Sequence, residues 1–149
     1  NAFIQGSERT LEQDLGFAIR QLADVALRAL SPGINDPTTA TDVVYSLAEV
    51  LTDIARCGSG EPVRCDEHEV PRLIFPTQSF GDYLELAFGQ ILHYGGDDEH
   101  VVNKVVGICW QLHDIAPLDE QREAVEEFFE RHGLNETEEQ QDESEGSTT

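Results

Sequence analysis

Basic residues are almost missing from this chain. Its 149 residues hold nine Lys and Arg against 30 Asp and Glu, for a formal net charge of −21, and Lys104 is the single lysine. A nucleic-acid-binding surface needs a basic face to meet phosphates, so this composition excludes nucleic acid as a partner. Without the six acids of residues 135–149 the remainder still carries −15. We therefore expect an acidic folded surface suited to a salt-rich cytoplasm, where ions screen the repulsion.

Long apolar runs are also absent. No stretch of eighteen apolar residues occurs, so we expect no membrane-spanning segment within this sequence, and no signal peptide opens it. The chain begins with Asn1-Ala2 and not with Met, which predicts a piece excised from a longer protein. Cysteine is limited to three residues, an odd number, which argues against a disulfide framework and for a reducing compartment.

What the sequence does contain is helical periodicity. Apolar residues recur at three- and four-residue steps in five segments, which capping residues, Gly and Pro delimit. The predicted helices lie between Thr10 and Ser31, Asp36 and Gly58, Ser79 and Gly95, Asp97 and Ala116, and Pro117 and Gly133. Thr10 with Gln13, Asp36 before Pro37, Ser79 with Asp82, and Asp97 are the predicted N-terminal signals.

The same periodicity predicts which side chains are buried. In the first helix they are Leu11, Leu15, Ala18, Leu22, Val25, Ala26, Ala29 and Leu30; in the second, Ala40, Val44, Leu47, Leu51 and Ile54. In the last three they are Phe80, Leu84, Phe88 and Ile91; Val102, Val105, Cys109 and Leu112; and Leu118, Val125, Phe128 and Phe129.

Helical periodicity is lost between residues 61 and 76. The run PVRCDEHEVPRLIF has two short apolar-flanked stretches around an acidic turn, which predicts a small β-hairpin with Pro71 at an edge position. The predicted fold is therefore mainly α: about five helices packed as a single-domain bundle over residues 8–134. Residues 1–7 are expected to end a preceding segment, and residues 135–149 to form a disordered acidic tail.

A candidate ligand site lies where the first two helices meet. Arg20, Asp24 and Arg28 follow at four-residue spacing and share one helix face, and the turn SPGINDP brings Asn35 and Asp36 just beyond its end. Two arginines grouped in this way could hold a small phosphate or carboxylate. The alternative is structural: Arg28 interacts favourably with the helix dipole near the C-terminal end, Asp24 neutralises the charge of Arg28, and Asp36 caps the next helix. On either interpretation Ile34 is expected to enter the core.

Other chemistry has weaker support. Ser31 lacks a neighbouring His and a strand–turn–helix elbow, so we predict no catalytic residue. Cys57, Cys65 and His68 have a spacing unlike common zinc sites, and we predict no metal and no cofactor. SPGINDP is long for a DNA-binding helix-turn-helix, and the helix after it is acidic.

One stretch resembles a known family. ERTLEQDLGFAIRQLADVALRALSPGINDPTTA, Glu8 to Ala40, is similar to the signature of a family of predicted bacterial and archaeal membrane proteins, domain of unknown function 2254. The resemblance implies a longer parent with transmembrane helices upstream and this chain as its soluble C-terminal part. It supplies no activity, substrate or catalytic residue.

The function expected from these observations is a non-enzymatic assembly or regulatory module on the cytoplasmic side of a membrane protein. Its expected partners are the transmembrane part of the same protein and, through self-association, further copies. The alternative is a small-anion sensor or enzyme centred on Arg20, Asp24, Arg28 and Asp36.

Overall fold

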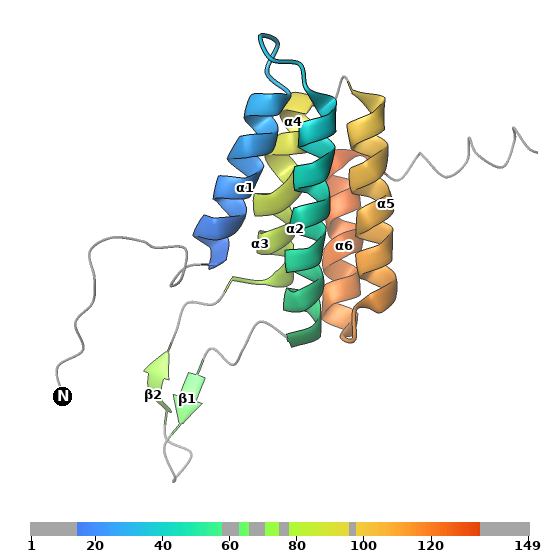
Figure 1. Cartoon of the computed structure of the whole chain (residues 1–149). Helices are drawn as coiled ribbons and strands as arrows, with labels where there is room; N and C mark the ends of the chain where they lie inside the picture. The colour runs from blue at the N-terminus through green and yellow to red at the C-terminus, as the bar shows by residue number, and fades with distance from the viewer. Residues whose placement is uncertain (1–14, 58–62, 66–70, 75–77, 96–97, 135–149) are drawn as a thin grey trace, which may run out of the picture.

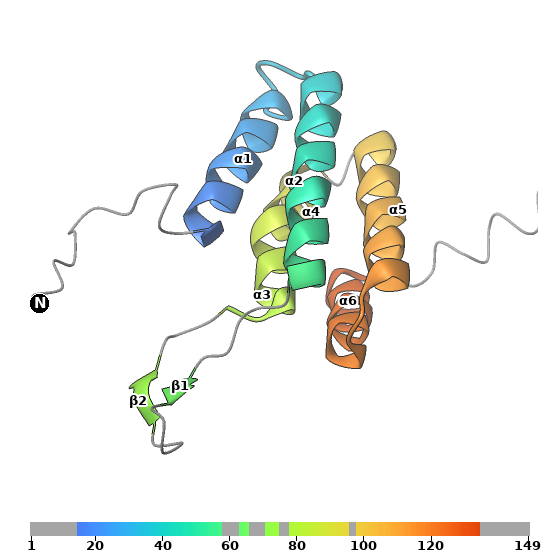
Figure 2. The same ribbon diagram turned by 60° about the horizontal axis from the view of Figure 1, so that its bottom comes forward.

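The computed structural model describes residues 15–57, 63–65, 71–74, 78–95 and 98–134. Its helices form two layers, and successive helical runs point in alternating directions (Figure 1). One layer holds α1 (Leu15–Ala29), α2 (Pro37–Cys57) and α5 (Glu99–Ile115). Behind it lie α6 (Asp119–His132) and a continuous helical run of α3 (Phe80–Leu84), η1 (Glu85–Gly89) and α4 (Gln90–Gly95) (Figures 1 and 2). The mainly α prediction is confirmed.

A short β-hairpin lies beyond the end of the bundle where α2 ends and α3 begins, here named the hairpin end (Figure 1). The sequence predicts a hairpin in this region. Strand β1 (Val63–Cys65) pairs antiparallel with β2 (Pro71–Ile74), with Val63 opposite Ile74 and an irregularity after Arg64. The hairpin connects α2 to α3 in the chain and lies outside both helical layers.

Capping side chains fix where two of the helices begin. The backbone N–H of Thr39 donates to Asp36 Oδ1 at 3.1 Å, and the Thr39 hydroxyl donates to Asp36 Oδ2 at 2.6 Å. These bonds, the hydroxyl's first, lower the pKa of Asp36. Ser79 and Asp82 form a reciprocal capping box at 2.8 and 3.1 Å. Both starts are therefore as predicted, whereas the predicted Thr10–Gln13 cap lies outside the described residues.

The start and end of the last two helices correct one prediction and confirm another. Asp98 caps α5, because its Oδ1 accepts from the backbone N–H groups of His100 and Val101 at 3.0 and 3.2 Å. The predicted cap, Asp97, lies outside the described residues. Gly133 ends α6 with a φ of 65°, the left-handed conformation for which glycine is preferred.

Most predicted core positions are buried. Every predicted side chain of α2 and of the α3–α4 run lies in the core, together with Phe128 and Phe129 of α6. Val102 is only partly buried, and Leu118 is wrong as a core residue: it is 49% exposed because it lies before α6, in the turn from α5.

The buried face of α1 is partly the predicted one: Ala26 and Ala29 are buried as predicted, and Leu22 and Leu30 are partly buried against the core. Gly16, Ile19, Ala23, Ala26 and Ala29 face the core. Leu15 and Val25, predicted to be buried, are each 44% exposed. Small side chains let α1 lie close to α2 and the α3–α4 run, and this close approach leaves Leu15 and Val25 at its margin.

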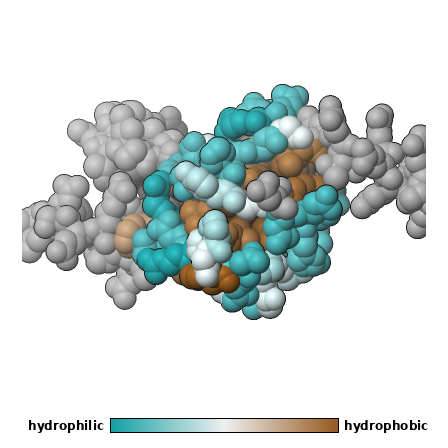
Figure 3. All heavy atoms as spheres, turned by 90° about the horizontal axis from the view of Figure 1, so that it is seen from above, coloured by the Kyte–Doolittle hydropathy of each residue, from teal (hydrophilic) through white to brown (hydrophobic). Residues whose placement is uncertain are grey.

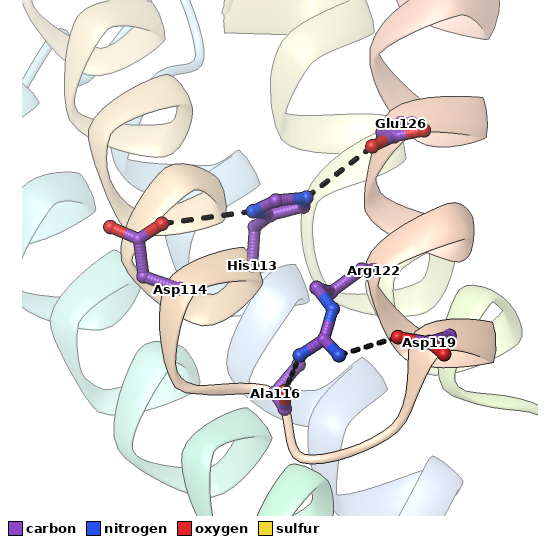
Figure 4. Close-up of polar contacts among 6 residues, drawn as sticks. All are labelled: His113, Asp114, Ala116, Asp119, Arg122 and Glu126. Carbon is purple, nitrogen blue, oxygen red and sulfur yellow. Dashed lines mark hydrogen bonds and ion pairs between the residues drawn. The ribbon is translucent and has the colours of Figure 1, made fainter.

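Polar contacts fasten α6 to its neighbours at the hairpin end. Arg122 donates to the carbonyl of Ala116 and pairs with Asp119, which ties the α5–α6 turn to α6 (Figure 4). One turn into the helix, Gln121 is 1% exposed and its Nε2 donates to the carbonyl of Ala55 in α2 at 3.1 Å. This carbonyl belongs to the last turn of α2, where no intrahelical partner exists.

Candidate functional site

The predicted ligand residues on α1 are exposed. Arg20, Asp24 and Arg28 all face solvent, and within the described part of the chain none of their three side chains forms a hydrogen bond or ion pair. Their spacing alone therefore does not lock them to one another. Their side chains are free to meet a ligand, as the predicted anion site requires.

Only part of that predicted site is brought together. Arg20 and Asp24 line a groove of about 370 Å³ between α1 and the α3–α4 run, here named the α1 groove. Facing them are Gln78, Asp82, Glu85, Leu86 and Gln90. Arg28, Asn35 and Asp36 do not line this groove. The five predicted residues thus divide among the groove (Arg20 and Asp24), the last turn of α1 (Arg28) and the SPGINDP turn (Asn35 and Asp36).

A close approach at Gly16 shapes one end of the groove. A Cβ atom at Gly16 would lie 2.4 Å from Oε1 of Gln78, so the Gln78 amide rests against the α1 backbone. Gly16 is buried, and glycine is the residue that leaves this space. The Gln78 side chain therefore lies against α1, and it lines the groove together with Arg20.

The SPGINDP turn is held by its own hydrogen bonds. The Ser31 hydroxyl donates to the carbonyl of Arg28 at 2.7 Å, and the N–H groups of Ile34 and Asn35 donate to the carbonyl of Ser31 at 2.9 Å. Asn35 has a φ of 48°, which asparagine tolerates better than most residues. Asn35 and Asp36 therefore have conformational and capping roles.

Ile34 does not enter the core as predicted. Its side chain is 61% exposed at the tip of the turn. The two bonds to Ser31 curl the turn back over the end of α1, and this curvature directs residue 34 outward. Figure 3 views the bundle from above, and hydrophobic residues (brown) are visible there between hydrophilic ones (teal).

A second cavity was missed by the sequence analysis. It has a volume of about 730 Å³ and is here named the Glu85 cavity. Glu85 Oε2 lies 3.0 Å from Nε2 of His132 and 3.4 Å from a guanidinium nitrogen of Arg131. The Phe128 ring packs on the His132 ring at 4.5 Å between centroids. Leu92, Val102 and Leu134 supply apolar lining.

The π-helical segment η1 explains the position of Glu85. One of its residues, Gly89, has no Cβ, and a Cβ there would lie 2.3 Å from Oε1 of Glu85. The carboxylate thus folds over its own helix. Glu85 also lines the α1 groove, so it stands on the wall between the two hollows. Neither a π turn nor a fold-back of this kind has a signal in single-sequence periodicity.

Catalytic and metal chemistry find little support in the described residues. No group of three His, Cys, Asp or Glu among them could hold a metal ion, and His68 of the weighed Cys57–Cys65–His68 set lies outside them. Burial raises the pKa of the Cys109 thiol to about 12, so it is not a nucleophile at neutral pH. The Ser31 hydroxyl is engaged with a helix carbonyl.

Comparison with known proteins decides the family. The model of the family described as "Predicted membrane protein (DUF2254)" matches residues 1–109. The chain belongs to this family. The match includes α1, the SPGINDP turn, α2, the hairpin and the α3–α4 run, and therefore both walls of the α1 groove.

Relatives of this family member are much longer than the chain. It is 41% identical over 101 residues to the uncharacterized proteins Rv1290c of Mycobacterium tuberculosis and Mb1321c of Mycobacterium bovis. The aligned part is 68% of this chain and 19% of each relative, so the chain spans about one fifth of their length. No solved structure matches. Within the described residues, no helix has the length and apolar character needed to cross a membrane.

Proposed function

We propose that this domain is a non-catalytic assembly module of a longer membrane protein, placed on the cytoplasmic side. The observation that carries the proposal is the contrast between family and segment. The family is described as a predicted membrane protein, the relatives are about five times as long as the aligned part, and the described helices include none that could span a bilayer. The membrane-embedded portion then lies in the rest of the parent chain.

The contacts of the polar side chains support a role without catalysis. Asp82 is engaged in the α3 capping box, and Glu85 holds His132 and Arg131. An activated nucleophile needs an adjacent base. Within the described residues, Ser79 contacts Asp82 only through the capping box, where the Ser79 hydroxyl accepts from the backbone N–H of Asp82. These charged side chains thus serve to cap a helix, in the case of Asp82, or to connect η1 with α6, in the case of Glu85.

The charge supports the proposed location. A net charge of −21 on 149 residues produces strong self-repulsion, which about 1 M salt reduces to a range of roughly 3 Å. Such a surface suits a cytoplasm rich in potassium ions, where acidity keeps the protein in solution.

The test compares the parent protein with and without this domain. The full-length protein, a version lacking residues 8–134, and a control lacking only residues 135–149 are purified in detergent with about 2 M KCl. We expect the domain deletion, and not the tail deletion, to reduce the oligomeric state measured by light scattering. An unchanged oligomeric state after domain deletion would refute the assembly role.

A second candidate function is supported by the α1 groove. Arg20 and Asp24 line it without being paired, so a small anion could be sensed there. The test is a thermal-shift panel of phosphate and small carboxylates in potassium salts. Arg20→Gln should abolish any shift, while Arg28→Gln, on the same helix but outside the groove, should retain it. No shift in the wild type removes this candidate.

A further inference from the structure

The Glu85 cavity combines charges of both signs with an apolar wall. Among the described residues that line it, one is an acid, Glu85, and one is a permanent base, Arg131. With histidine counted as neutral, this lining has no net charge, on a chain that carries −21. Leu92, Val102 and Leu134 supply the apolar wall. Pockets for small molecules combine apolar lining with a few placed polar groups, and this cavity has that composition.

The carboxylate of Glu85 is held in place from two sides. Its Oε2 lies 3.0 Å from Nε2 of His132, and because an ionised carboxylate only accepts hydrogen bonds, Nε2 is the donor. The His132 side chain is 17% exposed, and its ring packs on Phe128. Oε1 lies over Gly89, which also lines the cavity, and among the described residues no group donates to this oxygen. Oε1 is therefore placed to accept from a bound molecule.

Arg131 is held less firmly than Glu85. Its side chain is 58% exposed, and one guanidinium nitrogen lies 3.4 Å from Glu85 Oε2, which is long for a charge-assisted hydrogen bond. Within the described part of the chain this is the single hydrogen bond of the guanidinium, which has five N–H groups. A guanidinium binds a carboxylate through two parallel N–H groups. Arg131 therefore has the donors needed to bind the carboxylate of a ligand.

The two neighbouring charges determine which kind of molecule fits. A simple anion on Arg131 would be repelled by Glu85, and a simple cation on Glu85 would be repelled by Arg131. A molecule with an ammonium and a carboxylate on one carbon atom satisfies both side chains at once. Its ammonium has three donors for Glu85, and its carboxylate matches the guanidinium fork. An apolar substituent on the same carbon would then face the apolar wall.

We propose that the Glu85 cavity binds a free α-amino acid with an apolar side chain. Arg131 binds its carboxylate, Glu85 binds its ammonium, and the apolar wall contacts its side chain. The volume of about 730 Å³ lies within the roughly 300–1,000 Å³ of small-molecule pockets. Because Glu85 belongs to η1 and Arg131 to α6, the bound molecule connects these two helices. The assembly role does not depend on this ligand, so either proposal can fail without the other.

An NMR titration of the isotope-labelled 149-residue chain with L-leucine, in about 2 M KCl, tests the site. Both charged groups are partly exposed, so we expect a Kd on the order of 1 mM, with saturable changes at the amide signals of Gly89, Gln90 and Leu134. Isocaproate lacks the ammonium and isoamylamine lacks the carboxylate, and each should bind roughly tenfold more weakly. Isocaproate binding as tightly as leucine, or no saturable change with leucine, would overturn the proposal.

Paired variants separate the cavity from the rest of the surface. Glu85→Gln and Arg131→Gln should each weaken leucine binding by roughly tenfold or more. Glu126→Gln and Arg28→Gln are the matched controls, because Glu126 also contacts a histidine, at 3.4 Å, and neither residue lines the cavity. Equal losses in the test and control variants would show that leucine binds elsewhere. Circular dichroism confirms that all four variants are folded.

Gly89→Ala keeps every charge and tests the placement of the Glu85 carboxylate. The added Cβ would lie 2.3 Å from Oε1, so the carboxylate has to move. We expect leucine to bind roughly tenfold more weakly, whereas Gly107→Ala, a helical glycine with open space around it, should bind as the wild type does. Unchanged binding by Gly89→Ala would remove Glu85 as the ammonium partner.

A chain that ends at Leu134 tests the other possible occupant of the cavity, residues 135–149. We expect this shortened chain to bind leucine with the same Kd as the full 149 residues. Binding by the shortened chain alone would mean that the cavity belongs to residues 135–149, and the proposal would be wrong.

Discussion

Replacing Gln121 by leucine tests whether one buried hydrogen bond holds α6 to α2. The side chain is 1% exposed, its Nε2 donates to the carbonyl of Ala55 at 3.1 Å, and its Oε1 accepts from the N–H of Leu118 at 3.4 Å. Leucine has nearly the same volume, so packing is kept. The change removes the donor while the Ala55 carbonyl stays in place and stays buried.

The cost follows from that asymmetry. A buried carbonyl left without a partner costs about 1–3 kcal/mol, and the added apolar burial of leucine offsets part of this. We expect the free energy of unfolding to fall by about 1–2 kcal/mol, which corresponds to a decrease in Tm of roughly 3–10 °C for a domain of this size. The contact to Leu118, at 3.4 Å, is long and adds little.

Urea and thermal unfolding, followed by circular dichroism in about 2 M KCl, measure this change. Gln111→Leu is the control, because Gln111 is exposed on α5 and should alter the Tm by much less. A Gln121→Leu protein as stable as the wild type would show that the Ala55 carbonyl finds another partner, and the reasoning would be refuted.

Three further outcomes are expected from single residues. Gly133→Ala should lower the stability by about 1 kcal/mol because its φ is 65°, whereas Gly107→Ala, in mid-helix with open space, should raise it by up to ~1 kcal/mol; urea unfolding measures both. In native protein at pH 8, a thiol reagent should modify exposed Cys57 but reach Cys109, with a pKa of about 12, only after unfolding. Hydrogen bonds from Ser79 lower the pKa of Asp82, so its carboxyl titration by NMR should lie below 3.8, and its stabilising effect should be lost only as pH falls through that lowered value.

Local rules located most helices because local residues determine their ends. Asp36 and Pro37 start α2 through bonds that span three residues, and Ser79 with Asp82 starts the α3–α4 run in the same way. Such contacts need no knowledge of the tertiary fold. The burial of Leu47, Leu51 and the phenylalanines follows equally from a period of 3.6.

The buried face of α1 could be predicted only in part in this manner. Leu15 and Val25 are apolar at helical spacing, and periodicity assigns such residues to the core. The helix instead buries alanines and Gly16, because packing closely on two neighbours requires small side chains. Which apolar residues of α1 turn inward depends on those neighbours, which one helix's sequence does not specify.

The candidate site shows the same limit. Arg20 and Asp24 were predicted from one helix, and they do line a groove, but its opposite wall comes from residues about sixty positions later. The predicted burial of Ile34 was wrong because hydrogen bonds to the Ser31 carbonyl, and not hydrophobicity, set the direction of its side chain. The Glu85 contact with His132 joins residues 47 apart and depends on a π turn.

The odd number of alternating helical runs has a mechanical consequence. Helix α1 begins at the hairpin end of the bundle, and α6, the fifth run, finishes toward the opposite end (Figure 1). A pull applied between these two points would act along the helix axes, so the layers would have to slide past one another. They could not peel apart one contact at a time. The bundle is therefore arranged to transmit tension from one end to the other.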